Sequence, residues 1–569
     1  MKFDEFLFSH LGEMGKYQKI QFALVCIPTI FTAMHALSWT FAGVQTPHRC
    51  QLIGETKDSE YWTYTNLIKK TDECIDKDYV PVKKDEDGAR CFYEKCALAN
   101  GTECDAWVMD HTRQKSTALS RWDIVCGRGW LKAFIQSAYY IGQMAGSMIF
   151  GILGDKIGRK KVFVLAIVIQ ILCGFLQSIA PTWYLYALLR MGTGFSHPGI
   201  FVIAVVIGME LVGPKYRRLA SVITGLFFAL GQIILGLIAM HVTHYQVLHV
   251  ILSLPAIVFL SYWWIVPESA RWLVSVGRYK QADEVLQRAA KINGVTLPPK
   301  WWLQLDGVTE EGEGEKDDTK DNGDHVNLEA GTDDAQPNTV QRSYGFGDLL
   351  RTPEMRKRAL VVFYLWPVVS MVYYGLSMKS DILGGDLYIN FVVGGFIEIP
   401  ALIIVYLLID KIGRRFVLAG GYGIAGLCLL SNLIVPDPAP YWLALIQLLV
   451  SKGAITATYA SIYTFSPELF PTVVRNSAMG VCSMVARIGA ITASYVSMWI
   501  VDRFGRVFMI VPFGSLSVIA SILILLLLPE TMGKPLPATI EEVEEGDNNY
   551  KVNIEMEQLN RKEEPDAKD

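Results

Sequence analysis

The sequence predicts an all-α membrane protein whose twelve transmembrane helices form two six-helix bundles, with a disulfide-rich extracellular loop after the first helix. Apolar runs of about 20 residues recur along the 569-residue chain. Hydrophobic residues make up 51% of the sequence and charged residues only 19%. Motifs at the ends of the apolar runs occur once in each half. This composition excludes an ordinary soluble globule and a disordered chain.

Each predicted span is an apolar run bounded by polar residues. The spans cover residues 20–43, 129–153, 161–180, 183–211, 219–241, 246–266, 359–379, 387–409, 416–435, 441–465, 477–500 and 507–528. The first 18 residues lack an apolar core, so we expect no cleavable signal peptide. The predicted order is a cytoplasmic N-terminus (1–19), a first bundle (20–266) that includes an extracellular loop (45–128), a cytoplasmic linker (267–358), a second bundle (359–528) and a cytoplasmic tail (529–569).

Six of the ten cysteines lie in the polar segment after the first span. They are Cys50, Cys74, Cys91, Cys96, Cys104 and Cys126. An even number of cysteines in one polar segment predicts three disulfides in an oxidising compartment, and the pairing stays open. A zinc site is the alternative, but no Cys-x-x-Cys pair supports it, so we expect no metal. Asn100 begins a glycosylation sequon in the same segment, which agrees with an extracellular position.

Charge gives the same orientation. The short loops on the predicted inner side hold eleven Lys and Arg residues, against three on the outer side. Two segments are strongly acidic: residues 306–334 hold twelve acids and two bases, and residues 541–569 hold eleven acids and four bases. Such stretches are typical of a solvated loop and tail, and nucleic acid is not an expected partner. Before the first acidic segment, residues 278–292 show the spacing of an amphipathic helix.

Three motifs repeat between the halves. Leu153-Gly-Asp-Lys-Ile-Gly-Arg-Lys160 returns as Leu408-Ile-Asp-Lys-Ile-Gly-Arg-Arg415, 255 residues later. Glu210-Leu-Val-Gly with Arg217 returns as Glu468-Leu-Phe-Pro with Arg475 after 258 residues, and Pro267-Glu-Ser returns as Pro529-Glu-Thr after 262. Three matches at nearly one offset indicate a six-plus-six duplication.

At these residues the chain resembles the major facilitator superfamily, and within it the organic cation, anion and carnitine transporters (solute carrier family 22). The resemblance is carried by Gly151 to Lys160, the cysteine-rich loop, Pro267-Glu-Ser-Ala-Arg-Trp-Leu273, Glu468-Leu-Phe-Pro-Thr-Val-Val-Arg475 and Pro529-Glu-Thr531. It covers roughly residues 1–540. It implies the major facilitator fold and a plasma-membrane carrier that moves small organic ions by alternating access, with both termini cytoplasmic and the substrate site near mid-membrane between the bundles.

The repeated loop charges are candidates for an inner gate. They are Asp155, Arg159, Glu210, Arg217, Asp410, Arg414, Glu468 and Arg475. Asp155 and Arg159 are expected to pair across their turn, and Glu210 with Arg217 and Glu468 with Arg475 are expected to make matching contacts. The alternative is that these residues only hold the hairpins and the topology in place.

Ionisable residues deep in the spans are the candidates for substrate chemistry, because each is costly in a bilayer unless it is paired or solvated. They are Arg190, Glu398, Lys452 and Arg487. Arg190 and Lys452 are 262 residues apart, which suggests equivalent positions. If Glu398 neutralises one base, two positive charges remain, and the site favours an anionic group.

Aromatic residues in nearby spans offer the opposite attraction. Trp366, Tyr373, Tyr374, Phe227, Phe228, Tyr459 and Tyr463 are candidates for a cage around an ammonium group, although such stripes also serve helix packing. Rings together with surplus positive charge suit a zwitterion such as a carnitine-like betaine, with its carboxylate near Arg487. The family resemblance adds that cation members tend to carry an acid at this span-eleven position, whereas anion and carnitine members tend to carry arginine. The alternative is a scaffold pair between Arg487 and Glu398.

The function expected from these features is transport of an organic cation or zwitterion. An organic anion exchanger and a transporter-like receptor without flux are the alternatives, and no selectivity-filter sequence supports a channel. We expect no enzymatic activity and no cofactor, because no phosphate loop, metal cluster or nucleophile motif stands out. The expected partners are a small organic ion and the lipid bilayer, and the sequence does not identify a coupling ion.

Overall fold

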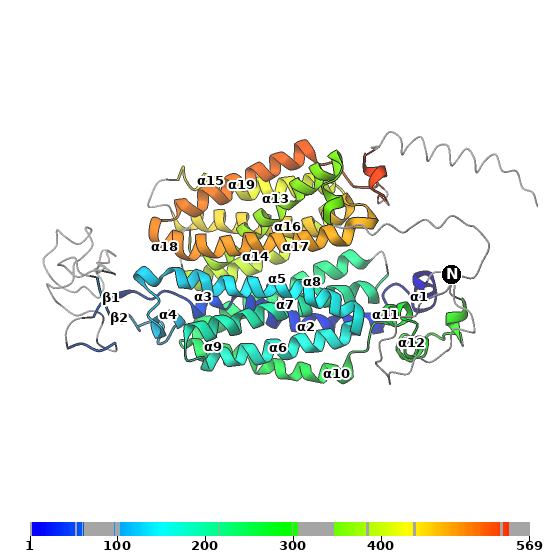
Figure 1. Ribbon diagram of the computed structural model, residues 1–569, viewed down its shortest axis with the longest axis horizontal. Coiled ribbons are helices and arrows are strands. Elements are labelled where there is room, and N and C mark those ends of the chain that lie inside the picture. Colours follow the sequence, from blue (N-terminus) through cyan, green and yellow to red (C-terminus); the bar gives the residue numbers. More distant parts are fainter. Residues whose placement is uncertain are drawn as a thin grey trace, which may run out of the picture.

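Long helices run side by side along the molecule in the computed structural model (Figure 1). The structure describes residues 3–51, 54–57, 59, 61, 96, 103–213, 216–298, 300–304, 346–382, 386–435, 440–534, 537 and 539–544. Among these residues, twelve long helical segments divide into two sets of six. This arrangement confirms the predicted fold class.

The first half contains five long helices and one broken helical segment. They are α2 (Lys16–Leu37), α5 (Trp130–Ile157), α6 (Arg159–Ile179), α7 (Trp183–Leu211), α8 (Arg217–His241) and α9 (Tyr245–Ser253), which continues through the 3₁₀ turn η4 (Pro255–Ser261) into α10 (Tyr262–Ile265). The break in the last segment begins at Pro255, which has no amide hydrogen to donate within a helix.

The second half repeats this order. It contains α13 (Pro353–Met378), α14 (Leu387–Leu408), α15 (Arg414–Ser431), α16 (Tyr441–Leu469), α17 (Thr472–Tyr495), which continues through the π-helical turn η8 (Val496–Ile500) into α18 (Val501–Phe504), and α19 (Val507–Leu527).

Ten of the twelve segments are long and apolar enough to cross a membrane by length and composition. The other two are α5 and α15. Helix α5 is less apolar because it carries Lys132, Gln136, Gln143 and Asp155. Helix α15 has only 18 residues and begins with two arginines. Helix α5 packs along α7, and α15 packs between α16 and α19.

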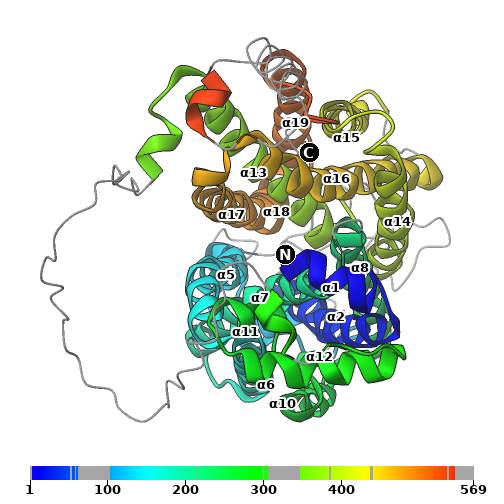
Figure 2. The ribbon, with the colours of Figure 1, turned by 90° about the vertical axis from the view of Figure 1, so that its right-hand side faces the viewer.

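The two halves meet through a small number of helices. Helix α5 packs against α17, and α8 packs against α14 (Figure 2). Within each half, glycines let neighbouring helices approach closely, and two of these glycines occupy equivalent positions in the two halves. A Cβ at Gly231 of α8 would lie 2.4 Å from the carbonyl oxygen of Ile30 in α2. A Cβ at Gly489 of α17 would lie 2.1 Å from the carbonyl oxygen of Pro367 in α13. These glycines are 258 residues apart, so the duplication extends to helix packing.

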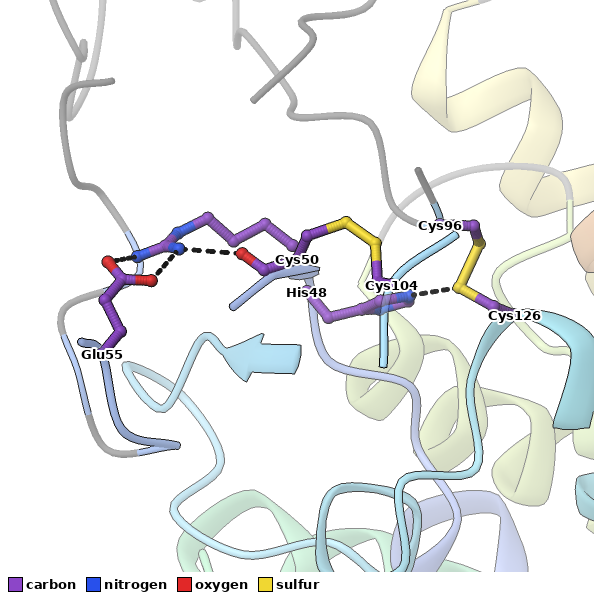
Figure 3. The surroundings of a disulfide bond; sticks show 7 residues. His48, Cys50, Glu55, Cys96, Cys104 and Cys126 are labelled. Carbon is purple, nitrogen blue, oxygen red and sulfur yellow. Dashed lines mark hydrogen bonds and ion pairs between the residues drawn. A yellow bond between two sulfur atoms is a disulfide. The ribbon is translucent and has the colours of Figure 1, made fainter. Parts of the chain in front are cut away.

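One end of the molecule, here called the disulfide end, carries the segment between α2 and α5. Strand β1 (His48–Cys50) pairs antiparallel with β2 (Trp107–Met109). Disulfides join Cys50 to Cys104 and Cys96 to Cys126 (Figure 3). Cys74, Cys91 and Asn100 lie outside the described residues, so the third disulfide and the glycosylation site stay predictions. The short elements here are α3 (Trp39–Ala42), α4 (Ala118–Arg121) and η2 (Cys126–Arg128).

The opposite end, here called the linker end, carries α1 (Phe3–Leu11), α11 (Ala270–Ser275) and α12 (Tyr279–Asn293) (Figure 1). Helix α12 covers the segment expected to be amphipathic and buries Ala282, Leu286 and Ala289, whereas Ile292 is exposed. The short 3₁₀ turns η5 (Trp301–Gln304) and η7 (Phe346–Leu349) border the acidic linker. The described residues on both sides of the acidic linker segment therefore lie at the linker end of the molecule.

Candidate functional site

Glu398 and Lys452 form a buried ion pair inside the second half. The Lys452 Nζ lies 2.8 Å from a carboxylate oxygen of Glu398, and each side chain is 3% exposed. Lys452 on α16 also donates to the hydroxyl of Ser377 on α13. The Tyr373 hydroxyl donates to Glu398 on α14 at 3.2 Å. Three helices thus contribute to one neutral, hydrogen-bonded group in the interior.

Aromatic rings continue from this pair along the inner face of the second half. The ring of Tyr373 lies 5.3 Å from Tyr459, which lies 5.7 Å from Tyr463. Tyr463 in turn contacts Trp366 at 4.7 Å. Tyr374 extends the array to the first half, where its ring lies 4.9 Å from Tyr140. The ring contacts of Phe228 are with His197 and Phe201 in the first half, apart from this array. Phe227 packs on another buried cluster, beside Phe22 and Ala220.

Arg487 lies near the middle of the continuous helical segment Thr472–Phe504. It is 5% exposed, and its Nε and Nη1 atoms have no hydrogen-bond partner among the described residues. Its electrostatic neighbours are hydroxyl groups, those of Tyr459, Tyr374 and Tyr463 in its own half and of Tyr140 in the other. The scaffold pair between Arg487 and Glu398 is not present, because Glu398 pairs with Lys452. Arg487 therefore presents a buried positive charge to neutral rings.

Arg190 has a different environment in the first half. Its guanidinium donates to the side-chain oxygen of Gln136 at 2.7 Å, to the Ser38 hydroxyl at 3.2 Å and to the Ala36 carbonyl at 3.4 Å. The expected equivalence of Arg190 and Lys452 is wrong, because the position that matches Lys452 lies four residues, about one helical turn, after Arg190. Helices α7 and α16 end 258 residues apart, at Leu211 and Leu469, so Lys452 corresponds to Gly194. Arg190 is held by neutral oxygens, and Lys452 by an acid.

The inner face of α16 becomes more exposed toward the linker end. Tyr459 and Tyr463 follow Lys452 by seven and eleven residues, so all three lie on one face of the helix. Lys452 is 3% exposed, but Tyr463 is 39% exposed. This face of α16 carries rings of the array and does not point away from the bundle. The exposure of Tyr463 therefore indicates open space between the two halves near the linker end.

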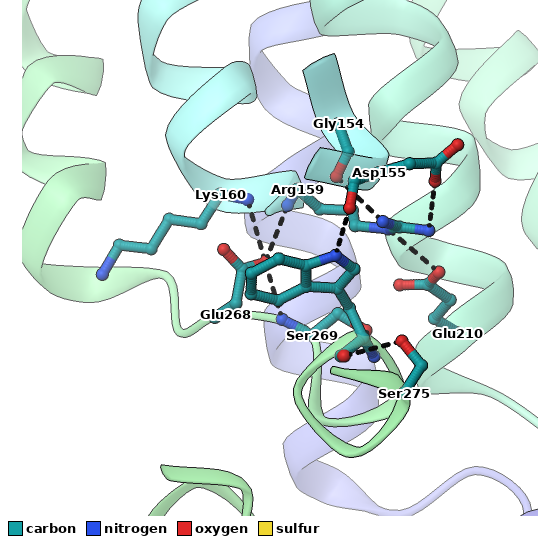
Figure 4. A network of polar contacts seen from close by, with 9 residues as sticks. Gly154, Asp155, Arg159, Lys160, Glu210, Glu268, Ser269 and Ser275 are labelled. Carbon is teal, nitrogen blue, oxygen red and sulfur yellow. Dashed lines mark hydrogen bonds and ion pairs between the residues drawn. The ribbon is translucent and has the colours of Figure 1, made fainter. Parts of the chain in front are cut away.

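At the linker end of the first half, Arg159 joins the candidate gate residues. It lies 2.9 Å from Asp155 and 3.2 Å from Glu210 (Figure 4). The indole of Trp272 on α11 donates to the Asp155 carbonyl at 2.9 Å. The side chain of Arg217 lies outside the described residues, so its expected contact with Glu210 stays a prediction.

The second half repeats this arrangement. Arg414 lies 3.0 Å from Asp410 and 3.3 Å from Glu468. The expected pairing of Glu468 with Arg475 is wrong, because Arg475 donates to the carbonyls of Pro467 and Phe470. Arg475 therefore caps the C-terminal end of α16, where carbonyl groups lack helical partners. Both clusters join residues of one half only, and their role in gating stays a prediction.

Two further acids complete these clusters. Glu268 accepts hydrogen bonds from the backbone amides of Arg159 and Lys160 at 2.9 and 3.1 Å (Figure 4). Glu530 accepts from the amides of Arg414 and Arg415 at 3.0 and 3.1 Å. Each carboxylate therefore caps the first turn of a helix. The preceding residues, Gly158 and Gly413, have φ of 102° and 105°, which glycine adopts without strain. The sequence signal is the repeated Pro-Glu-Ser/Thr motif, which indicates the duplication but does not by itself predict this capping.

Two ion pairs join the halves at the disulfide end, and neither was predicted from the sequence. Lys132 on α5 lies 3.1 Å from Asp502 on α18, which also binds Lys379 at 2.8 Å within its own half. Arg113 lies 2.6 Å from Asp386 at the start of α14. Apolar packing accompanies them, because Phe41 of α3 stacks on Tyr388 at 5.1 Å. The halves are thus in contact at this end.

Comparison with known proteins agrees with this architecture. Residues 91–543 match the family model described as "Sugar (and other) transporter". A Drosophila melanogaster protein named "Organic cation transporter protein" is 36% identical over 96% of this chain and 95% of its own length. A mouse protein named "Solute carrier family 22 member 21" is 30% identical over 94% of this chain and 92% of its own length. The chain belongs to solute carrier family 22 of the major facilitator superfamily. It is therefore a membrane transporter of organic ions and not an enzyme.

Other members of solute carrier family 22 are similar over comparable lengths. The human "Organic cation/carnitine transporter 2" is 29% identical over 94% of this chain and 92% of its own. Among solved structures, the xylose transporter XylE from E. coli in an inward open conformation aligns with a TM-score of 0.55 and 16% identity, over 74% of this chain and 90% of that one. At this identity the likeness concerns the fold alone.

Proposed function

We propose that this member of solute carrier family 22 carries small organic ions that bear a carboxylate, either zwitterions such as a carnitine-like betaine or organic anions, across the plasma membrane by alternating access. Arg487 is the residue we assign to the carboxylate. The observation that carries the proposal is the buried guanidinium of Arg487, which faces hydroxyl groups with two nitrogens unpartnered. An unpaired charge near mid-membrane is costly, and a substrate anion would neutralise it.

The charges around the site favour this substrate class. Glu398 is already neutralised by Lys452, and Arg190, a further buried cation within a span, is held by neutral groups. The centre of the protein therefore carries surplus positive charge, which attracts anionic groups and disfavours simple cations. The aromatic array of Tyr373, Tyr459 and Tyr463 provides faces for the cationic or apolar part of the substrate.

The contacts between the halves support an inward-facing state. In the proposed topology the disulfide end is extracellular and the linker end, with both termini, is cytoplasmic. The ion pairs Lys132–Asp502 and Arg113–Asp386 close the extracellular side, while Tyr463 is exposed on the cytoplasmic side. Substrate release to the cytoplasm would follow from this state, and a return to an outward-facing state would require both ion pairs to break.

The test is uptake of three labelled probes, tetraethylammonium, carnitine and benzoate, normalised to surface protein. Loss of a hydrogen bond to a charged group costs about 1.5–3 kcal/mol. Arg487→Ala should therefore weaken the apparent affinity for carnitine and benzoate by about 10- to 150-fold and spare tetraethylammonium. Saturation and trans-stimulation by unlabelled substrate would distinguish a carrier from a receptor that binds without flux.

Two further variants separate the ligand role from a scaffold role. Arg190→Ala removes a buried arginine that is bound only to neutral groups, so its loss should affect the three probes equally. Glu398→Ala combined with Arg487→Ala should be additive, because these residues do not pair. An equal loss for all three probes in Arg487→Ala, with a double variant no worse than the single ones, would contradict the proposal.

A further inference from the structure

The surroundings of the Lys452 ammonium match those that recognise an organic ammonium ion. Its Nζ lies 3.6 Å from the centroid of the Tyr373 ring, 2.8 Å from the Glu398 carboxylate and within hydrogen-bond reach of the Ser377 hydroxyl. An aromatic face combined with a carboxylate is the chemistry that binds ammonium groups in desolvated sites. We call Tyr373, Ser377 and Glu398 the ammonium site. In this structure a side chain of the protein itself fills it.

The ammonium site is continuous with the ring array that leads to open space. Tyr459 contacts Tyr373 on one side and Tyr463 on the other, and Tyr463 is 39% exposed. An ion that enters between the halves from the linker end therefore meets the rings before it reaches Glu398. Lys452 is the group that prevents such an ion from contacting this carboxylate.

A second position is available for the Lys452 ammonium. A small pocket beside Lys452 is bordered by Gln232, Ser377, Ser380 and Asn390, and it has space for about one water-sized group. The Gln232 side-chain oxygen is buried and has no hydrogen-bond partner among the described residues. Lysine has a flexible four-carbon stem, so its ammonium can move between the carboxylate and this polar pocket. Gln232 belongs to α8 in the first half, whereas the ammonium site belongs to the second.

We propose that Lys452 is a tethered competitor for the ammonium site, which a substrate ammonium occupies when Lys452 moves to the pocket beside Gln232. This inference deepens the proposed function, on which it rests, by assigning where the cationic part of a zwitterion binds. In this exchange one ammonium leaves Glu398 as another arrives. The Glu398 carboxylate therefore always has a cationic partner. A simple cation would have to displace Lys452 without the help of a carboxylate bound at Arg487. The tether therefore selects zwitterions over simple cations.

The decisive variant is Lys452→Met, which keeps an unbranched side chain and removes the competing charge. Glu398 is then left without its cation, and an external ammonium should take its place. We expect the half-saturating concentration of tetraethylammonium for uptake to fall about tenfold, with no gain for benzoate. Lys452→Arg keeps the tethered charge and should show no such gain. Lys357→Met removes a lysine from an exposed pair with Glu354 and controls for the loss of one charge.

Thermal unfolding of the purified proteins provides a second measurement that does not depend on flux or surface delivery. Added tetraethylammonium should raise the unfolding temperature of Lys452→Met more than that of the wild type or of Lys357→Met. If Lys452→Met shows no gain in tetraethylammonium affinity and no additional thermal stabilisation, the inference is wrong. If the wild type takes up none of the three probes, the proposed function fails instead, and the thermal measurement still decides whether Lys452 competes for the ammonium site.

Discussion

Lys132→Met should open the disulfide end, because it removes the positive charge that joins α5 of the first half to Asp502 of the second. Methionine keeps an unbranched side chain at this position, so the change is mainly one of charge. The Lys132 backbone carbonyl, which accepts a hydrogen bond from the Trp39 indole at 3.0 Å, remains. The variant therefore weakens one contact between the halves and leaves the local packing.

The size of the effect follows from the geometry of the pair. At 3.1 Å and an effective dielectric constant of about 20, the Coulomb attraction is about 5 kcal/mol. The side chains of Lys132 and Asp502 are only 10% and 23% exposed, so desolvation offsets most of this attraction. A net contribution of about 1–2 kcal/mol to closure remains, which corresponds to an increase of about 5- to 30-fold in the ratio of open to closed molecules.

The assay is the labelling rate of a cysteine reporter by a membrane-impermeant thiol reagent applied outside the cell. Phe41→Cys is a suitable reporter, because Phe41 is 4% exposed and packs on Tyr388 and Phe391 across the contact. Within the part of the chain that the structure describes, the free cysteines are Cys26, Cys173, Cys428 and Cys482, and the chain without the reporter measures the background labelling. Labelling should be about 5 to 30 times faster in Lys132→Met than in the reporter alone.

Lys379→Met is the matched control. Lys379 binds the same Asp502 carboxylate at 2.8 Å but lies in the same half, so its loss removes one charge without breaking a contact between the halves. We expect a much smaller change in labelling. Equal acceleration by both variants, or none by Lys132→Met at normal surface levels, would refute the assignment of Lys132 and Asp502 to closure.

Three further predictions concern the two ends. Arg159→Ala should slow transport and shift the apparent affinity of all three probes by the same factor, because Arg159 pairs with Asp155 and Glu210 at the linker end, far from the site at Arg487. A loss of uptake confined to one charge class of probe would contradict this. Burial raises the pKa of Asp386, but hydrogen bonds from Arg113 and the amides of Ile389 and Tyr388 outweigh it and hold the pKa below its usual value. The contact with Arg113 is therefore present above the usual pKa of about 4 and lost only as pH falls through the lowered value. Because thiol reagents react with the thiolate, the labelling rate of Phe41→Cys itself falls with pH, so the readout is the ratio of the rate with Asp386→Asn to the rate without it at the same pH. This ratio should exceed one and be the same at about pH 7.5 and 5.5. Asn100→Gln should remove one glycan in a gel-mobility assay, and an unchanged mobility would contradict the glycosylation of Asn100. Protection of this loop on the cytoplasmic side would contradict the extracellular position of residues 45–128.

The fold could be predicted from the sequence because its signals are local. An apolar run identifies a span, and the repeated motifs place equivalent turns in both halves. The pairs Asp155–Arg159 and Asp410–Arg414 have i,i+4 spacing, so their contact follows from helix geometry. The partners of Glu398 and Glu468 could not be predicted. Each had more than one base in reach, and the choice depends on how the helices are rotated about their axes.

The contacts at the disulfide end were missed for a related reason. Lys132 and Asp502 are 370 residues apart, and each lies near the end of a helix, where charged residues are common. The packing of α5 against α17 and η8 brings them together. The role of Glu268 and Glu530 required the positive φ of Gly158 and Gly413, which sequence spacing does not reveal.

The close backbone approaches at Gly231 and Gly489 favour movement of each half as a rigid body. At these points backbone lies against backbone with no side chain between, so there is little material that can deform. A helix of 28 residues such as α5 is about 42 Å long. Tilting such a rigid body by about 10° around its middle moves each end by about 4 Å in opposite directions. A gap opened by breaking Lys132–Asp502 at one end would therefore be matched by approach of the halves at the other, where Arg159 and Arg414 lie.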